Sequence, residues 1–175
     1  MLLVTALISA NGGADDNRGQ RNDHGNNQCG DLGGVTFQIR LDYSTFSAYE
    51  VVQLHGDGTT TSIDNTENGF SPQAGVEAQP YSAQLGEWKC LGRNRVEIRT
   101  ANYNYQVAGS STPSTLAINY VVLNWAKNSD SAQGTFRFAY FALGSFLTNT
   151  KAQPLPGKSF GPYPVIGRRL CFFKL

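Results

Sequence analysis

The side chains that could carry chemistry are few in this sequence. Its two histidines, His24 and His55, lie in a Gly- and Asn-rich stretch and beside a Gly-Asp-Gly turn, where solvent is expected. The motifs of serine hydrolases, phosphate-binding loops, zinc proteases and paired CxxC sites do not occur. We therefore expect no catalytic residues, no metal centre and no cofactor, which favours a protein that is not an enzyme.

Charged side chains within the expected strands alternate along single faces. Glu97 stands between Arg95 and Arg99, and Arg40 precedes Asp42 by two residues. Two interpretations stay open: charge pairs on a solvated outer face, or a polar cluster inside a barrel that holds an acid or base for a cyclase-type reaction. The other strand carboxylates are Glu50 and Glu87, and the aromatic residues expected to contact a small ligand are Tyr103, Tyr105, Phe138 and Tyr140.

From Val35 onward, apolar and polar residues alternate with the period of a half-buried strand, as Phe37, Ile39 and Leu41 illustrate. Turn signals recur between such runs, and no stretch has helical periodicity. The expected strands cover 35–43, 49–54, 59–64, 84–91, 95–107, 116–125, 133–147 and 165–173. Short turns between consecutive strands favour an all-β, antiparallel up-and-down β-barrel of about eight strands, because closure removes exposed edges. A two-sheet sandwich is the alternative.

Composition divides the chain into three segments. Residues 1–10 (MLLVTALISA) form an apolar run too short for a membrane span, which suits a signal-like segment or a strand added to a sheet edge. Residues 11–34 are rich in Gly, Asn and Asp, so we expect a flexible arm. The alternative is a cation-binding loop that uses Asp15, Asp16 and Asp23. Residues 35–175 form the barrel domain.

Cysteine usage and charge limit the compartment and the partners. Cys29, Cys90 and Cys171 allow one disulfide between any two of them if the protein is exported; otherwise the two strand cysteines are buried small apolar residues. The net charge is only +1, so no basic surface for nucleic acid is expected. We expect an extracellular or cell-surface protein with neither a membrane span nor a nucleic-acid partner.

Two segments, 117–125 and 136–141, are apolar on both strand faces. A barrel in water needs only its inner face to be apolar, so the outer face must be covered. This pattern predicts self-association, and a loop or the N-terminal arm lying over the strands is the alternative.

Four short patterns stand out along the chain: Gly86-Glu87-Trp88 before Gly92, a long strand ending in Asn102-Tyr103-Asn104-Tyr105, Gly134-Thr135-Phe136, and Gly167-Arg168-Arg169-Leu170. Together they resemble a group of small exported proteins, largely uncharacterised, with lipocalin-like or allene-oxide-cyclase-like barrels. The resemblance implies that Trp88 closes one end of the barrel as a structural plug, with Arg168 or Arg169 laid over its ring. In lipocalins the G-x-W pattern belongs to the first strand, whereas here it lies mid-chain.

Three functions follow from these expectations. The first is a noncatalytic extracellular barrel that binds a small apolar ligand or a protein surface. The second is a self-assembling subunit of a surface layer or fibre that uses residues 1–10 as an exchanged strand. The third is a cofactor-free isomerase or cyclase that acts inside the barrel. We place the binding barrel first.

Overall fold

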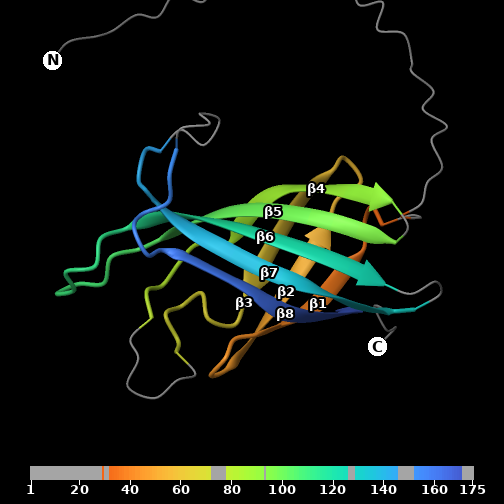
Figure 1. Cartoon of the computed structure of the whole chain (residues 1–175), viewed down its shortest axis with the longest axis horizontal. Helices are drawn as coiled ribbons and strands as arrows, with labels where there is room; N and C mark the ends of the chain where they lie inside the picture. The colour runs from red at the N-terminus through yellow and green to blue at the C-terminus, as the bar shows by residue number, and fades with distance from the viewer. Residues whose placement is uncertain are drawn as a thin grey trace, which may run out of the picture.

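In the computed structural model, the strands of the described residues form one closed antiparallel barrel. The structure describes residues 29, 32–71, 78–92, 94–125, 129–145 and 152–170. Eight strands follow one another in chain order, and β8 closes on β1 (Figure 1). The expected all-β, up-and-down barrel is confirmed, and the sandwich is not formed. The described residues hold no helix that is long and apolar enough to cross a membrane.

The strand bounds follow the alternation in the sequence. On β1, Phe37, Ile39 and Leu41 are buried in the lumen, while the residues between them face outward and are more exposed. The strands are β1 (Thr36–Asp42), β2 (Ser47–Leu54), β3 (Thr59–Asp64), β4 (Gln84–Gly92), β5 (Arg95–Asn104), β6 (Thr115–Trp125), β7 (Ser131–Ala142) and β8 (Ser159–Arg169).

The last strand differs most from its expected bounds. β8 begins at Ser159, six residues before the expected start, because Pro162 and Pro164 lie within the strand rather than in a link. A register shift between Phe136 and Phe138 on β7 lets the chain of β8 bulge at this point. A bulge accommodates proline, which cannot donate a hydrogen bond to the ladder.

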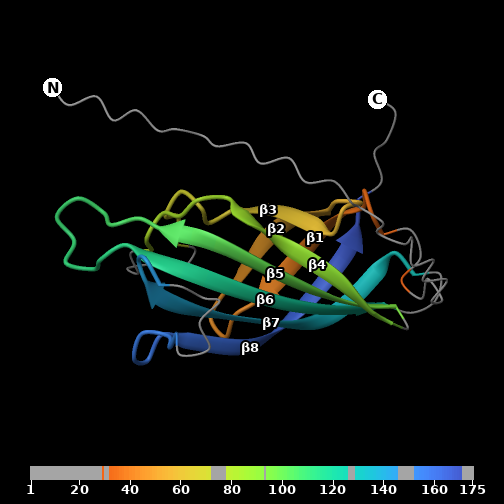
Figure 2. The ribbon, with the colours of Figure 1, turned by 90° about the horizontal axis from the view of Figure 1, so that it is seen from above.

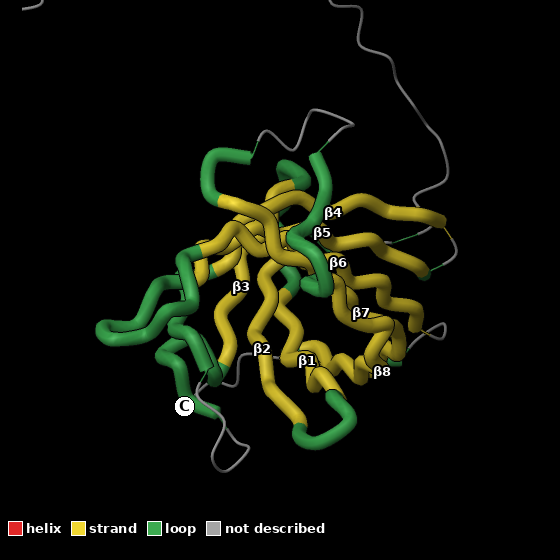
Figure 3. Tube along the Cα trace, turned by 60° about the vertical axis from the view of Figure 1, so that its left-hand side comes forward, coloured by secondary structure: helices red, strands yellow, loops and turns green. Residues whose placement is uncertain are grey.

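The two ends of the barrel differ in their connections. Short connections, 55–58, 93–94 and 126–130, join the strands at one end, which we call the packed end. Longer connections, 65–83, 105–114 and 143–158, follow β3, β5 and β7 at the other end, together with the short turn 43–46, and we call it the open end (Figures 1 and 2). Figure 3 brings the loops of the open end forward.

The hydrophobic core fills the packed end. Ile39, Leu54, Val96 and Leu123 reach 0 % exposure there. The chain before β1 helps to close this end: Leu32 is buried, Gly34 N donates to Leu54 O, and Leu54 N donates to Val35 O. The packed end is therefore sealed by the barrel wall and by the segment 32–35.

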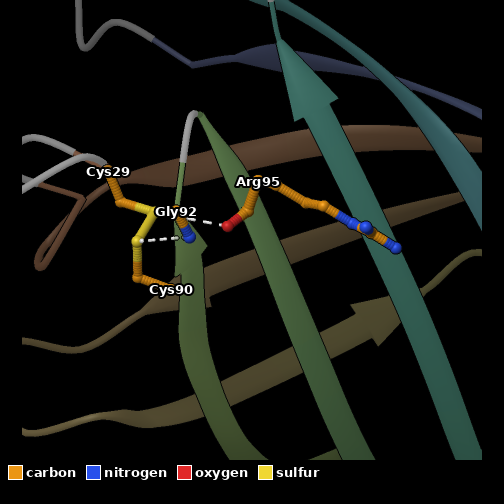
Figure 4. Close-up of a disulfide and its surroundings, with 4 residues drawn as sticks. All are labelled: Cys29, Cys90, Gly92 and Arg95. Atoms are coloured by element: carbon orange, nitrogen blue, oxygen red, sulfur yellow. Dashed lines mark hydrogen bonds between the residues drawn. A yellow bond between two sulfur atoms is a disulfide. The ribbon is translucent and has the colours of Figure 1, made fainter.

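A disulfide between Cys29 and Cys90 ties the N-terminal segment to β4 (Figure 4). The Gly92 amide donates to the Cys90 sulfur at 3.3 Å, and the Cys29 sulfur lies 3.3 Å from Arg95 O. The two cysteines are 61 residues apart. Restricting the unfolded chain with a loop of that length stabilises the fold by about 4 kcal/mol in the chain-entropy model.

Several expectations concern residues outside the described part of the chain. These are the apolar run 1–10, most of the arm 11–34 with Asp15, Asp16 and Asp23, and the third cysteine, Cys171. The signal-like or strand-forming role of residues 1–10 and the cation-binding alternative for the arm stay predictions. Leu32, Gly33 and Gly34, which composition places in the arm, belong to the closure of the packed end.

Apolar side chains also continue across the outer face. Leu85 on β4 lies opposite Ala101, Ala101 opposite Ile118, and Ile118 opposite Ala139. Leu85 is 63 % exposed. The self-association inferred from two-faced apolar strands stays a prediction, which a measurement of molecular size in solution tests.

Candidate functional site

A cavity of about 430 Å³ occupies the open end of the barrel, above the packed core. Its walls come from the inner faces of β3 to β7 and from the connections at this end of the barrel. The volume lies within the range of small-molecule sites, which is roughly 300–1,000 Å³. The lining residues are Tyr43, Phe46, Asp64, Thr66, Phe70, Ser71, Ala78, Gln79, Tyr81, Gln84, Asn102, Asn104, Thr112, Ala117, Asn119, Phe138, Tyr140 and Lys158.

One wall of the cavity is aromatic. Tyr43 and Phe46, from the turn between β1 and β2, stack with their ring centroids 4.5 Å apart. Phe138 on β7 lies 5.4 Å from Tyr140 and meets Tyr43 edge-on at 6.5 Å. The rings therefore support one another and present a preformed apolar surface to the cavity.

The adjoining wall is a chain of buried amides on β4, β5 and β6, where Asn119 of β6 lies directly beside Phe138 of β7. Asn119 Nδ2 donates to Gln84 Oε1 and to Asn102 Oδ1, both at 2.8 Å. Asn102 Nδ2 in turn donates to Asn104 Oδ1 at 3.3 Å, and Asn104 Nδ2 donates to Thr115 Oγ1 at 2.9 Å. Linked amides hold one another's orientation, so this wall offers fixed polar groups.

Two carboxyl groups lie on the inner faces of β2 and β3. Glu50 and Asp64 are directly opposite each other in the β2–β3 pairing, and Glu50 is only 3 % exposed. Asp64 lines the cavity, where it accepts hydrogen bonds from the Thr66 amide at 2.6 Å and from the Tyr81 hydroxyl. Glu67, in the connection that follows β3, accepts from the Asp64 amide at 3.3 Å.

These groups make the lumen unfavourable for further negative charge. Burial raises the pKa of Glu50 to about 8, and the negative charges of Asp64 and Glu67 add to the shift. Burial also raises the pKa of the Tyr43 and Tyr81 phenols, with the charge of Asp64 adding to both shifts. The Glu50 carboxyl therefore carries its proton at neutral pH.

The structure separates the four aromatic residues expected to contact a ligand. Phe138 and Tyr140 line the cavity. Tyr103 and Tyr105 are 53 % and 47 % exposed and do not line it. Tyr103 faces outward because β5 alternates, so its neighbours Asn102 and Asn104 face the lumen.

The residues expected to form a plug all lie toward the packed end. Trp88 packs against the core at the packed end, and its indole Nε1 donates to His55 O at 2.8 Å. Arg168 and Arg169 are exposed near the end of β8. The cation–π contacts within the described residues involve Tyr120, which lies beneath Arg99 and Arg137, rather than Trp88. The plug role of Trp88 stays a prediction.

The alternating charges on β5 form a cluster on the outer face. Glu97 lies 3.0 Å from Lys89 Nζ and 2.7 Å from Arg99 Nη2, and it accepts a hydrogen bond from the Tyr120 hydroxyl. Arg40 and Asp42 pair at 2.8 Å on the outer face of β1. Of the two interpretations of these charges, the structure therefore agrees with charge pairs on the outer face.

Glu50 is among the strand carboxylates expected from the sequence, but its orientation toward the lumen is not predicted there. The alternation along its strand does indicate that orientation. Glu50 shares its strand phase with Ala48, Val52 and Leu54, which are buried. A carboxylate in the apolar phase of a strand faces the core. The same phase argument on β5, starting from Val96 and Ile98, places Asn102 and Asn104 in the lumen.

No protein-family model, curated protein or solved structure matches this chain significantly.

Proposed function

We propose that the protein is a noncatalytic binding barrel that takes a small amphipathic molecule into the cavity at its open end. The observation that carries this proposal is the contrast between the walls of one cavity of about 430 Å³. Aromatic rings from β7 and the β1–β2 turn offer an apolar surface, and the amides of β4 to β6 offer fixed hydrogen-bonding groups. An apolar surface with a few fixed polar groups is what a small-molecule site needs for affinity and orientation.

The polar wall changes the expected ligand from a purely apolar one. Both hydrogen bonds to Gln84 go to its oxygen, and within the described residues none uses its amide nitrogen. A purely apolar ligand would remove water from these amides without replacing their hydrogen bonds, which costs about 1–3 kcal/mol for each orphaned group. A ligand with a hydroxyl or carbonyl group along one edge avoids that cost.

Binding of 2-naphthol and of naphthalene tests this proposal. Both have the same fused ring, and 2-naphthol adds one hydroxyl. We expect 2-naphthol to bind about tenfold more tightly, which corresponds to roughly one net hydrogen bond. Fluorescence titration measures both affinities.

Two matched substitutions locate the site. Ala117→Leu fills the cavity from β6 and should abolish binding, since Ala117 lines the cavity. Ala101→Leu makes the same change on the outer face, opposite Leu85, and should leave binding unchanged. Equal binding by the two variants would overturn the proposal.

Glu50 supports a second function, a cofactor-free isomerase. Its carboxyl is protonated at neutral pH and lies opposite Asp64, the member of the pair that lines the cavity, so a proton donor lies next to a proton acceptor. Exchange of the α-protons of 2-tetralone in D₂O, followed by NMR, tests for such proton transfer. Exchange faster than in buffer that is lost in both Glu50→Gln and Asp64→Asn would favour an enzyme. Exchange at the buffer rate removes this alternative.

A further inference from the structure

The Asp64 carboxylate lines the cavity without an ion-pair partner among the described residues. In the part of the chain that the structure describes, the ion pairs lie on the outer face: Arg40 with Asp42, and Lys89 and Arg99 with Glu97. Asp64 instead receives its hydrogen bonds from neutral donors of Thr66 and Tyr81. Lys158 lines the cavity from the connection before β8, but no ion pair of the described residues includes it.

The mutual effects of the lumen groups agree with this charge imbalance. Burial raises the pKa of Glu67, and the charge of Asp64 adds to that shift as it does for Glu50. A counter-ion held nearby would act in the opposite direction, because an opposite charge favours ionisation. The Asp64 carboxylate therefore faces the cavity without an ion pair, and Lys158, which also lines the cavity, is in no ion pair of the described residues.

A buried hydroxyl lies next to these carboxyls. Ser62 is 2 % exposed and faces the lumen one inward position below Asp64, opposite Gln84 of the cavity wall. Its hydroxyl hydrogen-bonds to the Glu50 side chain, which lowers the pKa of that carboxyl against the effect of burial. Neither Ser62 nor Glu50 lines the cavity, so Asp64 is the acidic group that a ligand in the cavity reaches.

The aromatic wall suits an organic cation better than a metal ion. Tyr43, Phe46, Phe138 and Tyr140 present π-faces and edges around the same cavity that Asp64 lines. Ring faces attract ammonium groups, most strongly where water is excluded. Within the described residues, no three His, Cys, Asp or Glu side chains converge as metal ligands do.

We infer that the cavity recognises an arylalkyl amine, whose ammonium group reaches Asp64 while its ring packs against Phe138 and Tyr140. The inference deepens the proposed binding function and rests on it. The ammonium donates to the Asp64 carboxylate, and the amide wall binds any further polar group of the ligand. Fixed lining groups then select the ligand by its charge as well as by its size.

Three probes with one skeleton test the inference: 2-(2-naphthyl)ethylamine, 2-(2-naphthyl)ethanol and 2-naphthylacetate. At neutral pH they are a cation, a neutral molecule and an anion. We expect the amine to bind roughly ten- to a hundredfold more tightly than the alcohol and the acetate to bind least. Calorimetry on the full chain at low and high salt measures all three. The amine preference should shrink with salt, because it is electrostatic.

Asp64→Asn should remove most of the preference for the amine and leave alcohol binding nearly unchanged. Asp130→Asn, the same change on an exposed turn at the packed end, is the matched control and should preserve the preference. If Asp64→Asn does not fold, the salt series on the unaltered protein still tests the inference, because an amine preference that does not shrink with salt would contradict it.

The outcomes separate the inference from the function on which it rests. If the alcohol binds, Ala117→Leu blocks it, and the amine binds no better, then the cavity is a binding site and the amine inference is wrong. Tighter binding of the acetate would also overturn the inference and point to Lys158. If none of the three probes binds, the proposed function fails as well.

Discussion

The two ends of this barrel use the same strands for opposite purposes. On β6, Leu123 and Val121 belong to the core of the packed end, while Asn119 and Ala117 line the cavity at the open end. On β5, Val96 and Ile98 give way in the same manner to Asn102 and Asn104. Each of these strands is held in place by the close-packed core at one end. The same strand therefore positions its polar side chains rigidly around the cavity at the other end.

The largest difference between the ends should appear when large side chains are truncated. Leu123→Ala in the packed end leaves a cavity among close-packed neighbours and should cost about 3–5 kcal/mol. Phe138→Ala removes a larger side chain, but Phe138 already borders open space, so we expect only the transfer loss of roughly 1–3 kcal/mol. Urea unfolding measures both. If Phe138→Ala costs more than Leu123→Ala, the open end is not hollow in solution.

A pH-dependent difference should follow from Glu50. Its pKa is raised to about 8 in the folded protein, against an ordinary value of 4.5. Between these values the folded state keeps a proton that the unfolded state has lost. The free energy of unfolding should therefore fall as pH rises from about 4.5 to 8 and then level off, with a total change of up to about 5 kcal/mol.

Glu50→Gln should flatten that slope and make the protein more stable than the unaltered chain at pH 8. Denaturant unfolding at pH 5, 6.5 and 8 measures the effect. Glu87→Gln, an exposed change on the outer side of β4, is the control and should keep the slope. An unchanged slope in Glu50→Gln would show that the lumen is better hydrated than its burial indicates.

Space at the two ends can be compared with one substitution made twice. Ala132→Leu at the packed end inserts atoms where Ala132 is 1 % exposed between Trp125 and Gly167, so overpacking should cost about 1–3 kcal/mol. Ala117→Leu enters the cavity and should change stability by less than about 1 kcal/mol. Thermal unfolding compares the two variants. A loss of stability in Ala117→Leu equal to that in Ala132→Leu would contradict the open cavity.

The packed end could be anticipated from the sequence far better than the open end. Alternation on β1 and β2 places Phe37, Ile39 and Leu54 inside without ambiguity, and closure follows because a meander of short strands must cover its edges. On β4 to β6 most of the inward residues at the open end are polar, so hydrophobic periodicity carries little signal on these strands. The direction of the side chains there follows only from the alternation that begins at the buried Ile98. Continued along β5, that alternation places Asn102 inward and Tyr103 outward.

Other parts of the site depend on contacts that no local pattern contains. Tyr81 bonds to Asp64 across the connection between β3 and β4, and Lys158 approaches the cavity from the other side of the barrel. Likewise, three cysteines allow three pairings, and only the closure of the packed end brings Cys29 beside Cys90. Long-range packing decides these features, so the sequence leaves them open.

The smallest expected difference concerns a single hydroxyl at each end. Thr60 is 1 % exposed, and its hydroxyl donates to Gln53 O at 2.8 Å, whereas the Thr115 hydroxyl accepts from Asn104 Nδ2 beside the cavity. Thr60→Val should cost about 1 kcal/mol, because water has no access to replace the lost bond. Thr115→Val should cost less than about 0.5 kcal/mol, since a water molecule in the cavity accepts from Asn104 in its place. Paired urea titrations resolve the two values. A cost for Thr115→Val as large as that for Thr60→Val would mean that the amide wall is dry, and an apolar ligand would then suit the cavity better than an amphipathic one.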